Sequence, residues 1–449
     1  MGTPTISSAE EMKALVSHAL ETALKLGASS AAAEVSDEKG RCVTVRNFDT
    51  ESIEYTRDRS FSICVYIGKS RASASSGDLS PKSIENTIRA AVDMARYTAE
   101  DKDAGLPPAD RLCLKPRNLN LCHPWDISVE EMTDIAVRAE RAGRDYSPQV
   151  VNSDGAGINS SVGSFVLGNT EGFLAGYPFS NHSIDVSLVA RDKNGMQNGS
   201  WYSLGTSPHD LLSPEEMGQI AARRAVSALS PRSLKTQKCP VIFEAPAARS
   251  LFRCFTRAVS GAMLYRDMSF LKNALDTKVF SDKLTIVENP FVPGAYGSAP
   301  FDDEGVLPSE RLIVDQGILR GLFLSTYTAR KLGMETTGNA GGPFNLFFRN
   351  RDEASEPTLV SLLHRMDRGL LVTETMGQGI NLTTGDYSQG ASGFWVENGE
   401  ICYPVENITV AGNLRDMFLG FDAMAEDYDL NGVVRCGSTL LAEMTVAGS

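Results

Sequence analysis

The spacing of hydrophobic residues changes twice within the first hundred positions. Apolar residues recur every three or four positions over 12–24, which predicts an amphipathic helix. Over 31–76 apolar and polar residues alternate, which predicts an antiparallel meander of strands. Ser80 and Pro81 are a typical N-cap and first-turn pair, and they begin a second helix. Residues 1–100 are therefore predicted to form a first domain that contains a helix, a meander of strands and a second helix.

The same order of elements returns after a segment rich in proline and charge. Residues 101–126 show neither period and are interpreted as a linker. Residues 127–235 then predict a helix, a set of strands and a closing helix, with Asn194-Gly195 as a hairpin turn. This repetition indicates a duplicated unit, and independent use of a good helix start remains the alternative.

The last part of the chain, residues 236–449, is richer in strand patterns. A short apolar strand at 241–243 precedes a helix predicted over 247–264, and a hairpin is expected to turn at Gly317. The fold class predicted is α+β. Two N-terminal α/β-meander/α units precede a larger β-rich C-terminal domain.

Composition excludes several classes of protein. The 449 residues are 42% hydrophobic and 22% charged, which is typical of a folded globular chain. The net charge of −13 and the absence of a dense basic stretch argue against nucleic-acid binding. No run of eighteen apolar residues, no signal sequence and no C-x-x-C pair occurs, so we expect a cytoplasmic protein that does not enter a membrane.

Four motifs occur in an order that points to a known family. They are an acidic loop at 301–305, a glycine-rich turn at 337–342, the stretch 385–404, and Cys436-Gly437. With them the chain resembles the TldD/PmbA (TldE) family of bacterial metalloproteases, and specifically its PmbA (TldE) branch. The resemblance extends over most of the chain.

The branch assignment rests on a helix that lacks its expected ligands. Catalytic TldD proteins carry His-Glu-x-x-x-His after the strand that corresponds to 241–243, whereas this chain has Arg249 to Arg257 there. Arg253 is a permanent cation and cannot bind zinc. Cys436 matches the position of a late zinc ligand, but one thiolate cannot complete a site. The resemblance implies no metal or catalytic residue in this chain, with zinc in a catalytic partner.

Six residues are candidates for contact with a peptide or for lining a substrate chamber. The acidic loop could bind a cation or a peptide amine, although such loops are often only solvated. The strands near 385–403 could accept a peptide as an added strand. The candidates are Asp302, Asp303, Glu304, Asp386, Tyr387 and Trp395.

The resemblance implies the non-zinc subunit of a TldD/TldE-type heterodimer that cleaves unfolded or leader peptides. Such activity serves peptide-antibiotic maturation or antitoxin turnover, and family members are also named modulators of DNA gyrase. The isolated chain is then expected to be inactive, with a TldD-type paralogue and peptides as partners. A non-enzymatic binding or regulatory protein, a stand-alone zinc peptidase with distant ligands, and a homodimer without the partner remain open.

Overall fold

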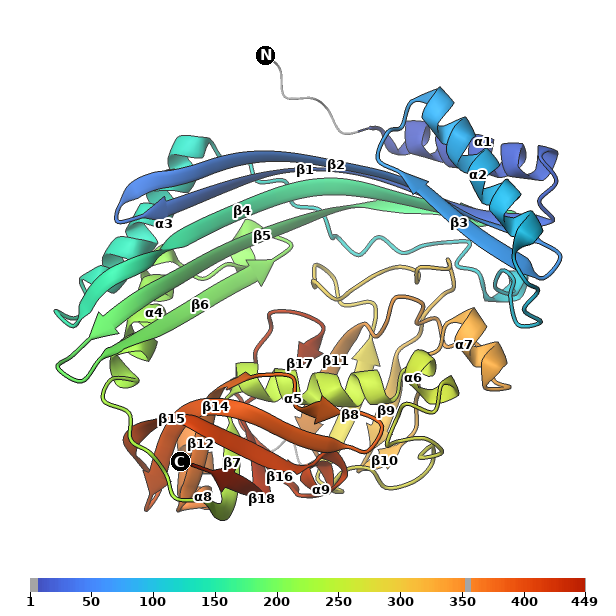
Figure 1. Ribbon diagram of the computed structural model, residues 1–449. Coiled ribbons are helices and arrows are strands. Elements are labelled where there is room, and N and C mark those ends of the chain that lie inside the picture. The colour runs from blue at the N-terminus through green and yellow to red at the C-terminus, as the bar shows by residue number, and fades with distance from the viewer. Residues whose placement is uncertain (1–6, 352–356, 449) are drawn as a thin grey trace.

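The computed structural model describes residues 7–351 and 357–448, so the first six residues of the stretch inspected for a leader lie outside it. A long curved sheet arches over a separate C-terminal domain, as Figure 1 shows. No helix in the described ranges is both long and apolar enough to span a membrane. The predicted α+β architecture is confirmed.

The arch is one six-stranded antiparallel sheet with the order β3-β2-β1-β4-β5-β6. Burial alternates along most of β1 and in the last seven residues of β2, so strand pairing and core packing reinforce each other there. The bounds are β1 Ser30–Arg46, β2 Asp49–Ile67, β3 Ser70–Ser76, β4 Val150–Asn169, β5 Leu174–Arg191 and β6 Met196–Gly205.

Two pairs of helices cover the ends of this sheet. Capping boxes form between Ser8 and Glu11 and between Ser128 and Glu131, and they fix where these two helices begin. Their apolar faces pack against β1–β3 at one end and β4–β6 at the other, forming two separate cores. The helices are α1 Ala9–Lys25, α2 Pro81–Tyr97, α3 Val129–Arg144 and α4 Pro214–Ser227.

The strand order itself reveals the duplication. Reading outward from the central β1–β4 pair, each half runs through a long second strand to a short third one. The two repeating units therefore do not form separate sheets, because the first strand of each pairs with the first strand of the other. Sequence patterns could not show this pairing, since nothing local specifies which distant strand β1 pairs with.

The segment between the two units crosses beneath the arch. It contains a short 3-10 helix, η1 (Ala109–Arg111), and it is otherwise extended. The backbone N–H of Ser180 in β5 donates to the carbonyl of Leu121 over 3.0 Å, so this segment borders the sheet. Its Leu112 and Cys113 pack with Phe173 and Phe301 in a small core that joins the arch to the C-terminal domain.

The C-terminal domain holds two further sheets. The larger follows the path β12-β7-β18-β15-β14-β13, with β16 paired to β18, and the smaller has the order β10-β9-β8-β11-β17. Their strands are β7 Gln237–Phe243, β8 Leu284–Asn289, β9 Arg311–Asp315, β10 Ile318–Leu319, β11 Asn345–Asn350, β12 Gly369–Met376, β13 Ile380–Asn381, β14 Asp386–Glu397, β15 Glu400–Asn413, β16 Phe421–Met424, β17 Val434–Arg435 and β18 Thr439–Ala447.

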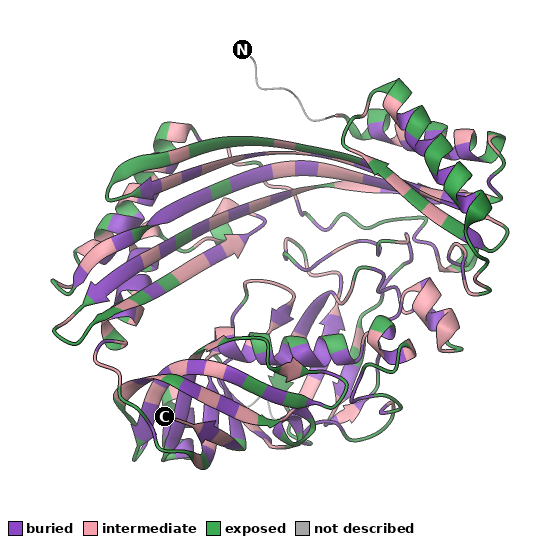
Figure 2. Cartoon of the chain, in the orientation of Figure 1, coloured by how far each residue is buried: buried purple, intermediate pink, exposed green. Residues whose placement is uncertain are grey.

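Helix α5 (Ala245–Ala258) lies at the centre of this domain, on its side toward the arch. The predicted helix over 247–264 is in fact two, because the chain breaks before the short α6 (Gly261–Tyr265). The remaining elements are η2 Pro208–Asp210, α7 Thr326–Lys331, α8 Leu359–Met366 and α9 Leu414–Leu419. Figure 2 shows buried residues concentrated around α5 and the two sheets.

Candidate functional site

The site begins with the helix that follows β7. Aromatic rings fix the inner face of α5: Phe252 stacks on Phe348 with centroids 4.3 Å apart, and Phe255 meets Phe280 edge to face at 5.0 Å. This close packing fixes how α5 is rotated about its own axis. The opposite face carries the three arginines 249, 253 and 257, four residues apart, and this face therefore looks toward the arch.

Arg249 connects three parts of the molecule. Its Nη1 lies 2.8 Å from Oδ2 of Asp429, and it also donates to the carbonyl of Asn431 and to the hydroxyl of Tyr202. Tyr202 belongs to β6 of the arch, while Asp429 and Asn431 belong to the loop before β17. The Asp429 side chain is 5% exposed, so the guanidinium compensates a buried charge. Arg253 and Arg257, in contrast, are exposed.

Cys436 lies next to this ion pair and is completely buried. Its thiol contacts the carbonyl of Ala245 at 3.8 Å, at the first residue of α5. Burial raises the pKa of the Cys436 thiol well above its usual range, the charge of Asp429 raises it further, and Arg249 opposes both. The thiol is therefore neutral near pH 7, which makes it neither a nucleophile nor a ready metal ligand.

The residues at this position do not fit a zinc ion. Asp429 is committed to Arg249, Cys436 is protonated, and a permanent cation occupies the space between helix and loop. Nowhere in residues 7–351 and 357–448 do three His, Cys, Asp or Glu side chains gather in an arrangement that could hold a metal. No catalytic step is therefore derived through a metal here.

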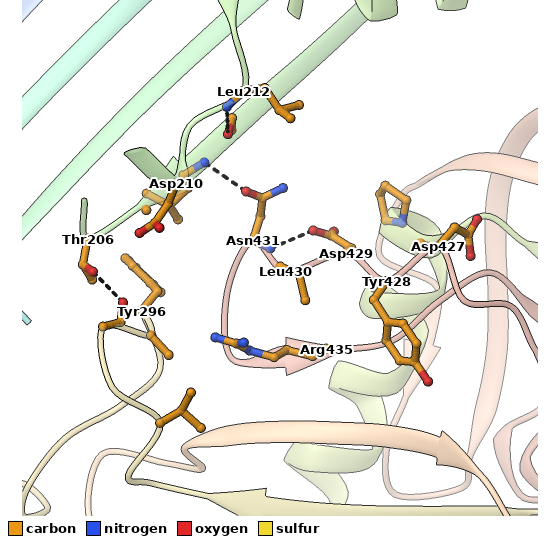
Figure 3. A pocket seen from close by; sticks show the side chains of 18 of the residues that line it. Thr206, Asp210, Leu212, Tyr296, Asp427, Tyr428, Asp429, Leu430, Asn431 and Arg435 are labelled. Atoms are coloured by element: carbon orange, nitrogen blue, oxygen red, sulfur yellow. Dashed lines mark hydrogen bonds between the residues drawn. The ribbon is translucent and has the colours of Figure 1, made fainter. Parts of the chain in front are cut away.

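A cavity of about 510 Å³ opens beside Arg249, where the arch meets the C-terminal domain. Figure 3 shows its walls, which come from β6, the start of α5, the loop at 292–296 and the loop before β17. Hydrogen bonds hold the two domains together around it, from Leu204 N to Asn431 Oδ1 (2.9 Å) and from Thr206 Oγ1 to the carbonyl of Gly294 (2.5 Å). Its apolar wall consists mainly of Trp201, Leu204, Pro246, Val292, Tyr296 and Leu430.

Arg435 extends into this cavity from β17, as the close view in Figure 3 shows. Its Nη2 donates to Asn345 Oδ1 over 3.0 Å and its guanidinium lies 5.3 Å above the ring of Phe347. Among the described residues no carboxylate lies within ion-pair distance of it, and its Nε has no hydrogen-bond partner. Burial lowers the pKa of Arg435, which shows that its charge is poorly solvated. The sequence analysis missed Arg435. The sequence does not show which carboxylates lie near an arginine, and only the fold reveals that none pairs with this one among the described residues.

The acidic loop divides into an inner and an outer part. Asp302 is 2% exposed and accepts backbone N–H groups from Glu304, Val306 and Ala340, each at 2.9 Å. Burial and the nearby Glu304 raise its pKa to about 7 despite these bonds. Asp302 therefore holds the loop and the glycine-rich turn together from inside. In this position its carboxylate is withdrawn from the surface, and its contact with a peptide stays a prediction.

Asp303 and Glu304 remain accessible and face the arch. The protein around Asp303 desolvates its carboxyl group and, with the charges of Glu34 in β1 and of Glu304, raises its pKa to about 6. Glu304 accepts the backbone N–H of Thr326 over 2.8 Å, at the start of α7. The fold thus brings three carboxylates from two domains near one another, and their role with a peptide amine stays a prediction.

The three candidates in β14 are not brought together. Tyr387 is 4% exposed beside Phe243, and Trp395 is 2% exposed with its Nε1 donating to Glu397. Both belong to the core of the C-terminal domain, and a role in a substrate chamber stays a prediction for them. Only Asp386 is exposed, and its carboxylate accepts the hydroxyl of Thr384 over 2.6 Å.

Comparison with known proteins agrees with this architecture. Models of the PmbA/TldA metallopeptidase match in three parts, domain 1 over residues 31–95, the central domain over 122–229 and the C-terminal domain over 236–448. The chain is 41% identical over 446 residues to metalloprotease PmbA of Escherichia coli O157:H7, covering 99% of this chain and 98% of that one. It is 40% identical to a PmbA homologue of Haemophilus influenzae, over 98% and 97% of the two chains.

Solved structures show the same fold. A proposed modulator of DNA gyrase from Bacteroides thetaiotaomicron aligns with a TM-score of 0.91 at 24% identity, covering 98% of this chain and all of that one. TldE from Thermococcus kodakarensis aligns with a TM-score of 0.84 at 18% identity, over 97% and 100%. The arch, the central helix and these matches define a three-domain protein of the metallopeptidase class. The chain belongs to the PmbA/TldD metallopeptidase family.

Proposed function

We propose that this chain is the non-zinc subunit of a TldD/TldE-type peptidase complex. The observation that carries the proposal is the Arg249–Asp429 ion pair beside Cys436, on the helix where catalytic TldD proteins carry His-Glu-x-x-x-His. An arginine there repels a metal cation, and the same guanidinium contacts Tyr202 of the arch. The zinc, the general base and the attacking water would belong to a paralogous partner.

The cavity beside Arg249 supports a role in holding the substrate. It combines apolar walls with one guanidinium that has no carboxylate partner in the part of the chain that the structure describes. An unfolded peptide offers apolar side chains and carboxylates or carbonyl oxygens, which such a wall could receive. The exposed Asp303 and the half-buried Glu304 would favour peptide amines elsewhere on the surface that faces the arch. All eight cysteines are free, which supports the inference of a reducing cytoplasm.

The test is reconstitution with a paralogue that carries His-Glu-x-x-x-His. Zinc content and hydrolysis of an unfolded peptide are measured for the chain, the paralogue and the mixture. The expected result is zinc-free, inactive chain, and a one-to-one complex whose activity exceeds that of the paralogue alone. Arg435→Gln should raise the KM of the complex without changing its zinc content.

Two outcomes would overturn the proposal. One zinc per isolated chain, lost together with peptidase activity on Cys436→Ser, would favour the stand-alone peptidase. Equal activity of the paralogue with and without this chain would favour a binding or regulatory protein.

A further inference from the structure

The cavity beside Arg249 contains a cation that lacks a counter-charge in the described part of the chain. Arg435 extends into it from β17, with its guanidinium 5.3 Å above the ring of Phe347 and its Nη2 3.0 Å from the amide oxygen of Asn345. Both of these partners are uncharged, and the Nε of Arg435 has no hydrogen-bond partner. A buried charge without a counter-charge is unfavourable, so a ligand that supplies one is favoured at this point.

The position of this guanidinium is fixed by the residues behind it. Asn345 is fully buried, and its Nδ2 donates to the carbonyl of Asn289 over 3.0 Å and to Oγ of Ser298 over 2.8 Å. These two bonds orient the amide so that its oxygen faces Arg435. The arginine is therefore held in place before any ligand arrives, which reduces the cost of binding.

The guanidinium is also desolvated already. Burial lowers the pKa of Arg435, and no charged neighbour offsets this effect. The cation has thus lost part of its water when the chain folded. An anion that enters the cavity has to lose only its own water, which makes their pairing more favourable than that of two fully solvated ions.

The carboxylates that line the same cavity are engaged elsewhere. Asp429 pairs with Arg249, and Asp427 accepts the N–H and the hydroxyl of Ser438 over 2.8 and 2.7 Å. The third, Asp210, is exposed, so solvent screens its charge. Three acids beside two arginines nevertheless disfavour a multiply charged anion such as a phosphate group. The cavity suits a ligand with one negative charge.

Apolar side chains form the rest of the wall. Tyr296 and Leu430 line the cavity although they are 45% and 60% exposed, and Trp201, Pro246 and Val292 continue the same surface. Large apolar side chains left open beside a cavity are typical of a binding surface. A ligand that fits this wall carries an apolar group close to its negative charge.

We propose that this cavity binds a carboxylate of a peptide together with an adjacent apolar side chain, and that Arg435 receives the carboxylate. The class of ligand, a peptide, rests on the proposed function, whereas the preference for a carboxylate rests on the cavity itself. Two sources offer the same chemistry, the C-terminal carboxylate of a peptide and the side chain of an internal Asp or Glu. Each presents a planar, singly charged group that a guanidinium binds well.

Fluorescence anisotropy of labelled peptides with the purified full chain tests the preference. One pair of peptides ends in leucine as the free acid or the amide, and a second, amidated pair contains Leu-Glu or Leu-Gln inside the sequence. We expect the acidic member of at least one pair to bind about tenfold more tightly than its neutral counterpart, and that pair identifies the source. Because the chain carries a net charge of −13, general electrostatics would favour the neutral peptide and cannot produce this result.

Variants of the cavity assign the preference to one residue. Arg435→Gln should remove the difference between acidic and neutral peptides, and Arg435→Lys should retain part of it, because the charge persists without the planar fork. Arg253→Gln removes an exposed arginine of α5 that does not line the cavity, and this matched control should leave the difference unchanged. Leu430→Asn should weaken both members of a pair equally, by about threefold, since it changes only the apolar wall. Circular dichroism and the unfolding midpoint of each variant verify folding.

Equal affinities within both peptide pairs would overturn the inference, and so would a preference for the acid that persists in Arg435→Gln. The comparison of peptides on the wild type needs no variant, so it remains decisive if a substitution disturbs folding. Both results are independent of reconstitution with the paralogue. Selective binding of the acid without a gain of activity in the mixture would support the carboxylate site and contradict the proposed function, whereas equal binding with a gain would do the reverse.

Discussion

Arg249 and Asp429 form a largely buried ion pair, with Nη1 and Oδ2 2.8 Å apart and side-chain exposures of 18% and 5%. The first residue lies on the central helix and the second on the loop before β17, and the guanidinium also reaches Tyr202 in the arch. A structural contact thus lies beside the buried Cys436. Through Tyr202, Arg249 also joins the C-terminal domain to the arch.

The first prediction concerns this pair. Arg249→Met should reduce the free energy of unfolding by about 3–5 kcal/mol, because Asp429 would remain buried without a compensating charge. Arg253→Met, one turn along the same helix but exposed, should change it by less than about 0.5 kcal/mol. Urea unfolding followed by tryptophan fluorescence compares the two variants.

A second substitution separates charge from packing. Adding Asp429→Leu to Arg249→Met should recover most of the lost stability, since both buried charges are then removed. If the double variant were less stable than the single one, the loss would arise from packing and hydrogen bonds to Tyr202 and Asn431, and the ion-pair explanation would be wrong.

The second prediction concerns pH. The pKa values of Asp302 and Asp303 are raised to about 7 and about 6, so the folded protein binds more protons than the unfolded chain between about pH 4 and 7. Their contribution to stability is therefore present at low pH and is lost as the pH rises through these values. Asp303→Asn should flatten this loss and stabilise the protein at pH 8, on the order of 1 kcal/mol after solvent screening.

Thermal unfolding between pH 5 and 8 measures this dependence, with Glu400→Gln as the control for a change of one exposed charge. Asp302→Asn is a poor substitute, because its amide would face the N–H group of Ala340 that the carboxylate now accepts. An Asp303→Asn variant with the same slope as the wild type would contradict the assignment of this carboxyl group.

The third prediction concerns the contact between α3 and α4. A Cβ atom at Gly218 would lie 2.0 Å from the carbonyl oxygen of Ala139 and 2.7 Å from the nitrogen of Gly143, both backbone atoms that cannot rotate away. Gly218→Ala should therefore destabilise the protein by about 1–3 kcal/mol, although alanine favours helices by about 1 kcal/mol. Gln219→Ala, exposed on the same helix, should be neutral or stabilising, and calorimetry distinguishes the two. Equal midpoints would mean that the helices can separate at no cost.

Local sequence determined the elements and most of their ends. Ser8, Ser128 and Ser213 begin their helices because each caps backbone N–H groups within three residues, an interaction that needs no tertiary partner. The alternation in 31–76 and the turns at Gly317 and Gly399 likewise follow from backbone preferences. The four motifs in order were enough to identify the family resemblance before any fold was known.

Only the tertiary structure decided which of these residues meet. Asp302, Tyr387 and Trp395 looked like site residues, yet long-range packing buries them, and burial depends on neighbours that lie far away in the chain. Arg249 pairs with Asp429 across 180 positions, whereas no carboxylate in the described part of the chain comes within ion-pair distance of Arg435. Sequence patterns act over a few residues, whereas charge compensation, burial and strand pairing depend on the complete fold. The sequence therefore determined the helices and strands, and the tertiary structure determined the site.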